Sequence, residues 1–336
     1  MPATGVTNLI EHGPRPSARQ VHMVLSPHSL PYACLALSSL LSNAREPLEL
    51  HLITDSHADK TTLVDAVAEL QAPSHHIVSV FAEDELADAE ASRFARYHRL
   101  RAFRHGHPCW RKITDPLLLS DAGSELILLD PDLYFPNPFS FEATPPTGLL
   151  LMWQRPNCLL PPEIVRAAFH ANIPLARHVD IGVSHWRESS ADLDWIDWLL
   201  GKLSGGGMLP RLMHVEAIVW AAIALHGGGG YLDPRLWVCW HRTQARRLRR
   251  KLGVSGQSIL AAEPWATMKS FHAGGEAKWW VPEVAASLTQ AADALTSAGR
   301  VQPFVELTSA RYEQEQRGKA LIRGLGYYRF FGQKTA

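Results

Sequence analysis

Two short segments of the sequence carry side chains whose types and spacing suit metal and phosphate chemistry. The first is Asp130-Pro131-Asp132, which directly follows the apolar run 125–129. Two carboxylates at positions i and i+2, held by the intervening proline, can bind a hard divalent cation through their oxygens. Such a turn more often serves only to satisfy local backbone groups. The pair alone therefore leaves a structural role open.

The second segment is 271–280, with the sequence FHAGGEAKWW. His272 can offer an imidazole nitrogen to a cation, and Lys278 can offer an ammonium group to phosphate. Gly275 has no side chain, so the backbone there can approach a diphosphate closely. A histidine beside glycine and tryptophan is usually a packed residue, and this segment gains its meaning only together with the carboxylate pair.

Alternating strand-like and helix-like segments must position these side chains. In the first half, strands are predicted at 21–25, 48–53, 76–81 and 125–129, and helices at 31–41 and 59–70. This order predicts an α/β fold with a parallel sheet and crossover helices. Ligands of such sheets bind beyond the carboxyl ends of the strands, where Asp130 and Asp132 stand.

The second half continues with less regular alternation. Strands are predicted at 149–152, 179–184, 236–239 and 267–271, and helices at 162–171, 191–203, 211–225 and 282–297. We expect a flexible segment at 1–19, one catalytic domain at 20–300 and a helical, then aromatic and basic, extension at 301–336. The aromatic end, 325–331, could cap the core, which we favour, or touch a membrane or partner.

The charge balance limits the possible partners. The 336 residues include 33 Lys and Arg and 33 Asp and Glu, so the formal net charge is zero. Nucleic-acid binders draw affinity from cations that neutralise phosphates, and the balance therefore argues against a nucleic-acid partner. The four cysteines lack zinc-site spacing and the first twenty residues lack an apolar signal run. We therefore expect a cytoplasmic protein.

Two charged segments have a structural and a functional interpretation. The segment 83–104 begins with acids and ends with arginines, which favours a solvated helix with a compensated dipole over an arginine face for an anionic ligand. The basic run 242–251 favours a solvated helix face, and the alternative is contact with acidic lipid headgroups or a phosphorylated acceptor.

The motifs taken together resemble the GT-A glycosyltransferases, in particular glycosyltransferase family eight. The segment 24–41 is similar to that family's first strand and helix, and Asp130-Pro131-Asp132 to its metal-binding DxD motif. His272, Gly275, Lys278 and Trp280 have the spacing of its HxxGxxKxW motif. The resemblance covers most of the chain and implies a Rossmann-like mixed sheet flanked by helices.

The resemblance also implies a set of roles. Asp130, Asp132 and His272 would bind Mn²⁺ or Mg²⁺, which would bridge the diphosphate of a nucleoside-diphosphate sugar. Donor contacts would come from Ser26 near the nucleoside, Lys112 at sugar or phosphate, and Gly275 and Lys278 at the diphosphate. The acceptor would be a hydroxyl of a saccharide, a lipid-linked molecule or a protein.

Two positions depart from the family pattern. The family usually has Asn-x-Gly where this chain has Asp180-Ile181-Gly182, and Asp-Gln near Glu216. Asp180 could orient acceptor hydroxyls and Glu216 could lie under the donor sugar, or both could be structural. They are the only bases we nominate as catalytic.

The sequence thus predicts a metal-dependent hexosyltransferase, with retention of configuration favoured by the resemblance. A non-catalytic relative that binds nucleotides or acts as a scaffold is the alternative. A nucleotidyltransferase or metal-dependent phosphohydrolase ranks last, because it leaves the His-Gly-Lys-Trp spacing unexplained.

Overall fold

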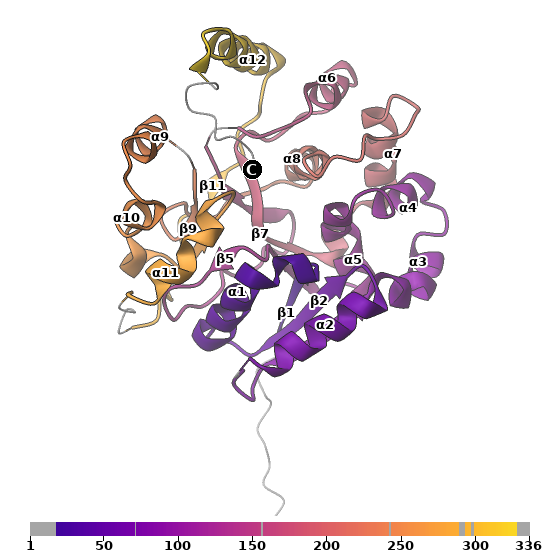
Figure 1. The fold of residues 1–336 in the computed structure, drawn as a ribbon. Coiled ribbons are helices and arrows are strands. Elements are labelled where there is room, and N and C mark those ends of the chain that lie inside the picture. Colours follow the sequence, from indigo (N-terminus) through magenta and orange to yellow (C-terminus); the bar gives the residue numbers. More distant parts are fainter. Residues whose placement is uncertain are drawn as a thin grey trace, which may run out of the picture.

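An eight-stranded mixed sheet runs through the centre of the computed structural model, in the order β11-β8-β6-β7-β4-β1-β2-β3 (Figure 1). The structure describes residues 18–70, 72–155, 157–241, 243–288, 293–296 and 299–327. The predicted segment 1–19 therefore lies almost wholly outside the described residues. The strands of this sheet are β1 (Arg19–Val24), β2 (Leu48–Thr54), β3 (Ile77–Ala82), β4 (Glu125–Leu129), β6 (Leu149–Trp153), β7 (Val179–Arg187), β8 (Gly229–Tyr231) and β11 (Gln302–Pro303).

Four neighbouring strands form the parallel half that the sequence predicts. β1 pairs with β2 and β4, and β2 pairs with β3, all in parallel. β7 then runs antiparallel to both β4 and β6, which makes the sheet mixed. The mixed α/β fold class predicted from the sequence is confirmed.

Helices cover both faces of this sheet, and the alternation of β4 shows why both faces are apolar. Leu126 and Leu128 enter one buried cluster, and Ile127 and Leu129 enter the cluster on the opposite face. The latter cluster includes α1 and α2, which Figure 1 shows together beside β1 and β2. The helices are α1 (Leu30–Asn43), α2 (His57–Ala68), α3 (Ala87–Arg93), α4 (His98–Arg104), α5 (Arg111–Leu119), α6 (Pro162–His170), α7 (Leu193–Leu203), α8 (Val215–Gly227), α9 (Gln244–Lys251), α10 (Gly256–Leu260), α11 (Val281–Ala285) and α12 (Ser309–Gly324).

A second, three-stranded sheet has the order β5-β10-β9. β5 (Leu133–Tyr134) follows the Asp130 turn directly and pairs antiparallel with β10 (Ser270–His272), which pairs in parallel with β9 (Trp237–Cys239). A third apolar cluster lies behind it and includes residues of α10 and α11. This small sheet connects the two segments that the sequence singled out.

Several predicted helices have different limits in the structure. The segment 83–104 is not one helix: a 3-10 turn at Glu83–Leu86 leads into α3, and residues 94–97 separate α3 from α4. The predicted helix 282–297 ends at Ala285 in α11, and α8 begins at Val215 rather than at residue 211. The error in the first case comes from reading the charge order as a helix dipole.

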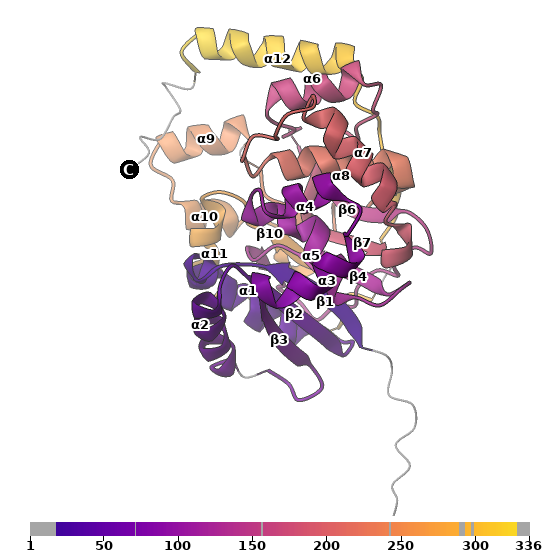
Figure 2. The same cartoon turned by 90° about the vertical axis from the view of Figure 1, so that its right-hand side faces the viewer.

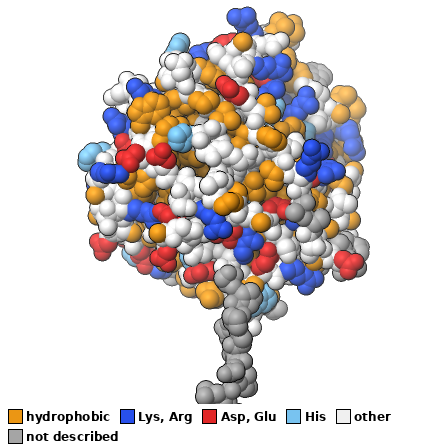
Figure 3. Space-filling view, turned by 180° about the vertical axis from the view of Figure 1, so that it is seen from behind, with side chains coloured by type: hydrophobic (Ala, Val, Ile, Leu, Met, Phe, Trp, Pro, Cys, Tyr) orange, Lys and Arg blue, Asp and Glu red, His pale blue; other side chains and the backbone are white. Residues whose placement is uncertain are grey.

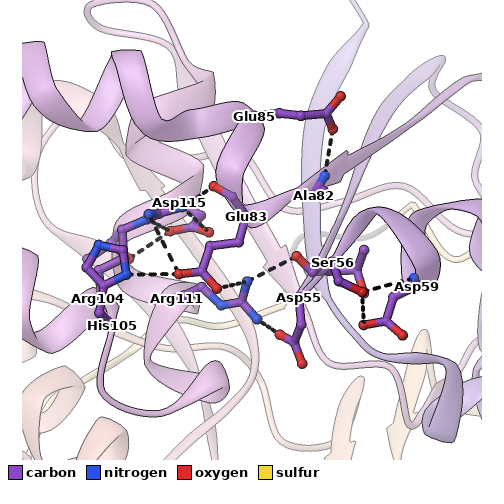
Figure 4. A network of polar contacts seen from close by, with 12 residues as sticks. Asp55, Ser56, Asp59, Ala82, Glu83, Glu85, Arg104, His105, Arg111 and Asp115 are labelled. Carbon is purple, nitrogen blue, oxygen red and sulfur yellow. Dashed lines mark hydrogen bonds and ion pairs between the residues drawn. The ribbon is translucent and has the colours of Figure 1, made fainter.

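The arginines of that segment bind carboxylates of the protein itself. Arg104 is buried, and its guanidinium contacts Glu90 Oε2 at 2.5 Å and Asp115 Oδ1 at 2.8 Å. Figure 4 shows it between Glu83, His105 and Asp115. Beside it, Arg111 joins the ends of β2 and β3 through Asp55 and Glu83. Arg104 is thus compensated inside the protein, whereas Arg96 and Arg99 form their ion pairs at the surface.

The segment predicted as a C-terminal extension is joined to the main fold. β11 pairs with β8 at the edge of the main sheet, and α12 packs on α6, with the Tyr312 ring 5.8 Å from that of Phe169. Figure 2 shows the two helices side by side. Of the aromatic end, residues 328–331 lie outside the described part, and Leu325 is 77% exposed rather than buried in the core.

Residues 244–251 of the predicted basic run form α9, and some of its arginines contact other side chains of the protein. Arg246 pairs with Glu263 and its guanidinium carbon lies 4.1 Å from the Trp240 ring centroid, while Arg250 lies over Trp280. Arg242 lies outside the described residues. On the face in Figure 3, basic and acidic side chains are interspersed around hydrophobic ones. In the described ranges, no helix has both the length and the apolarity that a membrane span requires.

We predict that Arg104→Met lowers the free energy of unfolding by about 3–5 kcal/mol, because it leaves Glu90 and Asp115 buried without their cation. Urea denaturation measures the change. The control is Arg101→Met, which removes a 44% exposed partner of the same Glu90 and should cost about 1 kcal/mol or less. Equal losses for the two variants would contradict the assigned importance of the buried guanidinium.

Candidate active site at the end of β4

Backbone hydrogen bonds hold the Asp130-Pro131-Asp132 turn between the two sheets. The Asp130 amide donates to the Gly182 carbonyl on β7 at 2.9 Å, and the Asp132 carbonyl accepts from the Ala273 amide after β10 at 3.0 Å. The apolar β4 is buried, so the turn begins where the chain leaves the core. Both aspartates are thereby fixed at the carboxyl edge of the parallel strands, where the fold predicts ligand binding.

His272 faces this carboxylate pair because β10 pairs with β5. In that pairing His272 lies opposite Leu133, the residue after Asp132. Its Nε2 lies 3.1 Å from Asp132 Oδ1 and 3.6 Å from Asp130 Oδ2. The two motifs predicted from the sequence therefore meet at one point.

The donor atoms fit a divalent cation. Asp130, Asp132 and His272 each offer one ligand atom, and these atoms lie within 4.8 Å of one another. Two carboxylate oxygens and one imidazole nitrogen form a set that suits hard or borderline divalent metals. The described part of the chain holds a second possible metal-binding group, formed by Asp180, Cys239 and His272. It lies at the other nitrogen of the same imidazole, Nδ1.

Burial and the histidine set the protonation of this cluster. Burial raises the pKa of Asp130, and the opposing charges of Lys112 and His272 only partly offset that effect. Burial also acts to raise the pKa of Asp132, but His272, Lys278 and Lys112 together outweigh it and lower the pKa to about 2. The pKa of His272 is raised well above its usual value, because the negative charges of Asp180 and Asp132 outweigh the effect of burial. An imidazolium therefore balances the acids here.

Lys112 and Glu216 form a buried layer behind Asp130. Lys112 Nζ lies 2.5 Å from Asp130 Oδ1 and 3.6 Å from Glu216 Oε2, and Glu216 Oε1 accepts from Trp220 Nε1 at 3.3 Å. Burial raises the pKa of Glu216 to about 8 despite the nearby ammonium. Two residues that the sequence nominated separately thus belong to the same ionic network as the metal-binding candidates.

Asp180 lies on the opposite side of the imidazole. It is 4% exposed, and its Oδ1 accepts from His272 Nδ1 at 2.8 Å and from the Gly182 amide at 2.9 Å. Asp180 is therefore directed towards the histidine in this structure, and a set of protein donors already satisfies the carboxylate.

Among the predicted donor-binding residues, Lys278 lies beside Asp132 and next to α1. Lys278 and Asp132 line one small pocket with Tyr32, and Lys278 Nζ lies 4.3 Å from the Tyr32 ring centroid. Gly275 has a φ of 69°, a conformation that favours glycine, and an added Cβ there would meet open space. Ser26 lies two residues beyond the end of β1, and its carbonyl accepts from the Ser29 amide.

Two neighbours of the site were missed by sequence reasoning. The Cys239 thiol donates to Asp180 Oδ2 at 3.2 Å, although the sequence shows it only as an isolated cysteine. Tyr32 supports Lys278 from α1 and donates to Ser29 Oγ at 3.1 Å. Cys239 ends a predicted strand, which is a weak signal, and nothing in the sequence distinguishes Tyr32 from a core residue.

Comparisons with known proteins support the fold. The sequence matches no family model and no curated protein. Among solved structures, apo mouse xyloside xylosyltransferase 1 has a TM-score of 0.50 and 13% identity, covering 78% of this chain and 99% of that one. Galactosyltransferase LgtC, solved with donor and acceptor sugar analogs, has a TM-score of 0.40 and 12% identity, covering 80% and 96%. Apo GlyE of Streptococcus pneumoniae has a TM-score of 0.41 and 10% identity, and the match covers 76% of this chain and 54% of GlyE.

The match to the xylosyltransferase shows a shared architecture at an identity too low to carry function. The chain therefore has the GT-A fold that the sequence predicted. The assignment to family eight stays a prediction.

We predict that Gly182→Ala destabilises the metal-free protein by about 1–3 kcal/mol, the usual cost of overpacking. An added Cβ would lie 2.5 Å from His272 Nδ1 and 2.9 Å from Asp180 Oδ1. Urea denaturation measures the loss. As a control, Gly318→Ala on α12 meets nothing within 4 Å and should stabilise by about 0.5–1 kcal/mol. Unchanged stability of the Gly182 variant would show that the imidazole ring of His272 is not held in place beside Gly182.

Proposed function

We propose that this protein is a metal-dependent glycosyltransferase that moves a hexose from a nucleoside-diphosphate sugar to a hydroxyl acceptor. The observation that carries the proposal is the convergence of Asp130, Asp132 and His272 Nε2 at the carboxyl edge of a GT-A sheet. The shared architecture with a xylosyltransferase supports a transferase of this class.

Asp130, Asp132 and His272 would hold Mn²⁺ or Mg²⁺. Such an ion stabilises the negative charge of a departing nucleoside diphosphate. The mixture of two carboxylates with one imidazole favours Mn²⁺ over Mg²⁺, since Mg²⁺ prefers oxygen ligands and retained water.

Lys278 and Gly275 would bind the donor diphosphate. Lys278 shares a pocket with Asp132, so its ammonium is placed beside the carboxylate expected to bind the metal. The Tyr32 ring supports the cationic head without neutralising it. Ser26, two residues beyond the end of β1, would lie nearer the nucleoside.

Glu216 and Lys112 would act below the donor sugar, next to Asp130. Both are buried, and their charges are coupled through Lys112 Nζ. A carboxylate fixed in a site that excludes water would stabilise a developing positive charge on the sugar more strongly than solvent does, and Lys112 would hold that carboxylate in place. We propose retention of configuration, with Glu216 as the carboxylate nearest the reacting carbon.

The alternative to an enzyme is a non-catalytic protein that binds nucleotides. As a separate proposal, the protein contacts a membrane that carries its acceptor. The exposed Leu248 on the basic α9 and Leu252, directly after that helix, support such a contact. An assay for donor binding without turnover separates the first alternative from an enzyme.

We predict that Asp132→Asn lowers turnover by at least about a hundredfold, because it removes one ligand and one charge from the metal site. The assay is Mn²⁺-dependent donor hydrolysis or transfer, screened over nucleotide sugars that raise the melting temperature of the wild type. Asp121→Asn, on an exposed turn, is the control and should retain full activity. Equal activity of the two variants would refute the metal role.

We predict that Glu216→Gln lowers kcat by about a hundredfold or more and leaves the donor affinity within about threefold, as for a group that acts in the transition state. The change keeps the shape and removes the carboxylate. Turnover and calorimetric donor binding are measured on the same preparation. A parallel loss of donor affinity would assign Glu216 to binding instead.

A further inference from the structure

We propose that Asp180 is a positioning residue: it orients the His272 ring and fixes the proton on Nδ1, so that the Nε2 lone pair points towards the metal site of Asp130 and Asp132. The inference deepens the proposed function and rests on its metal site. It gives Asp180 a role other than the acceptor base that the sequence suggested.

The geometry around Asp180 directs it at the imidazole. Its Oδ1 lies 2.8 Å from His272 Nδ1, while Nε2 of the same ring lies 3.1 Å from Asp132 Oδ1. The ring is thus held from both sides, with Asp180 and Asp132 at opposite nitrogens. The histidine is 9% exposed, so the surrounding protein also restricts its rotation.

The chemistry of a carboxylate determines which tautomer forms. A carboxylate accepts hydrogen bonds and has no hydrogen to donate. Nδ1 must therefore carry the proton, and the lone pair of a neutral His272 then lies on Nε2. A metal-bound histidine usually donates its other N–H to a carboxylate or carbonyl, which fixes the ring and raises its basicity.

The strands place Asp180 for this role. β7 has a register shift where it pairs with β6 near Met152, the partner of Asp180. Irregular pairing of this kind re-aims a side chain. Two residues further along, Gly182 leaves room for the imidazole, since an added Cβ would lie 2.5 Å from Nδ1. The amide of Gly182 also holds Asp180 Oδ1 at 2.9 Å.

The two rival roles fit the contacts less well. As a base for an acceptor hydroxyl, Asp180 would need to be accessible, but it is 4% exposed and both of its oxygens already accept from protein donors, Oδ1 from His272 and Gly182 and Oδ2 from Cys239. As a direct ligand with Cys239, it would place the metal on Nδ1. That arrangement would put the proton on Nε2, and His272 would then have no lone pair for a metal held by Asp130 and Asp132.

The test measures Mn²⁺ affinity, by the electron paramagnetic resonance signal of free Mn²⁺, in the wild type and three variants. We expect Asp180→Ala to weaken binding by about 10–100-fold, the usual effect of removing such a partner. Asp180→Asn should weaken it less, because the amide oxygen can still accept from Nδ1. The control Asp233→Asn, a buried aspartate paired with Arg235, should keep the wild-type affinity.

A Co²⁺-loaded wild type supplies a second readout that does not depend on activity. Cobalt bound by Asp130, Asp132 and His272 should show no thiolate-to-cobalt absorption, and such a band, lost in Cys239→Ser, would overturn the proposal. Wild-type Mn²⁺ affinity in both Asp180 variants would overturn it and leave the proposed function intact. Failure of the wild type to bind Mn²⁺ would overturn both. Melting temperatures without metal check that each variant is folded.

Discussion

Repulsion between buried carboxylates is the constraint on which the rest of this site depends. Asp130, Asp132 and Asp180 surround one imidazole, and each is at least mostly withdrawn from solvent. Buried charges of one sign are stable only when cations or hydrogen-bond donors face them. His272 lies between the three acids and Lys112 lies behind Asp130, so the positions of these two cations follow from the acids. Any shift of β10, which carries His272, would leave the aspartates uncompensated.

The small sheet provides this coupling between distant segments. β5 begins directly after Asp132, and its pairing with β10 fixes His272 beside the turn, while β9 brings Cys239 beside Asp180. The main sheet acts on the other side, because β7 supplies Asp180 and receives the Asp130 amide at Gly182. The site is therefore a junction between two sheets rather than a feature of one loop. A junction of this kind holds several charged groups rigidly, as electrostatic catalysis requires.

The sequence predicted the parts of this arrangement that depend on local pattern. Apolar runs identified β1, β2 and β4, and the spacing of His272, Gly275 and Lys278 identified the second motif. It failed at 83–104, where the charge order resembled a helix dipole but Arg104 is buried against Asp115. It also could not place Cys239 at Asp180 or Tyr32 at Lys278, because these contacts depend on side-chain packing between elements that have no periodic signature. Nor could it show that Asp180 faces His272, since that contact depends on irregular pairing in β7.

The zero net charge of the chain also has a local counterpart at the site. Asp130, Asp132 and Asp180 face three cations: Lys112 beside Asp130, an imidazolium at His272, and Lys278, whose charge acts on Asp132. These three acids and three bases balance. A divalent cation that displaced the proton of His272 would add one further positive charge, which an anionic ligand such as a diphosphate would compensate. The balanced cluster thus suits a dication that binds together with an anionic donor.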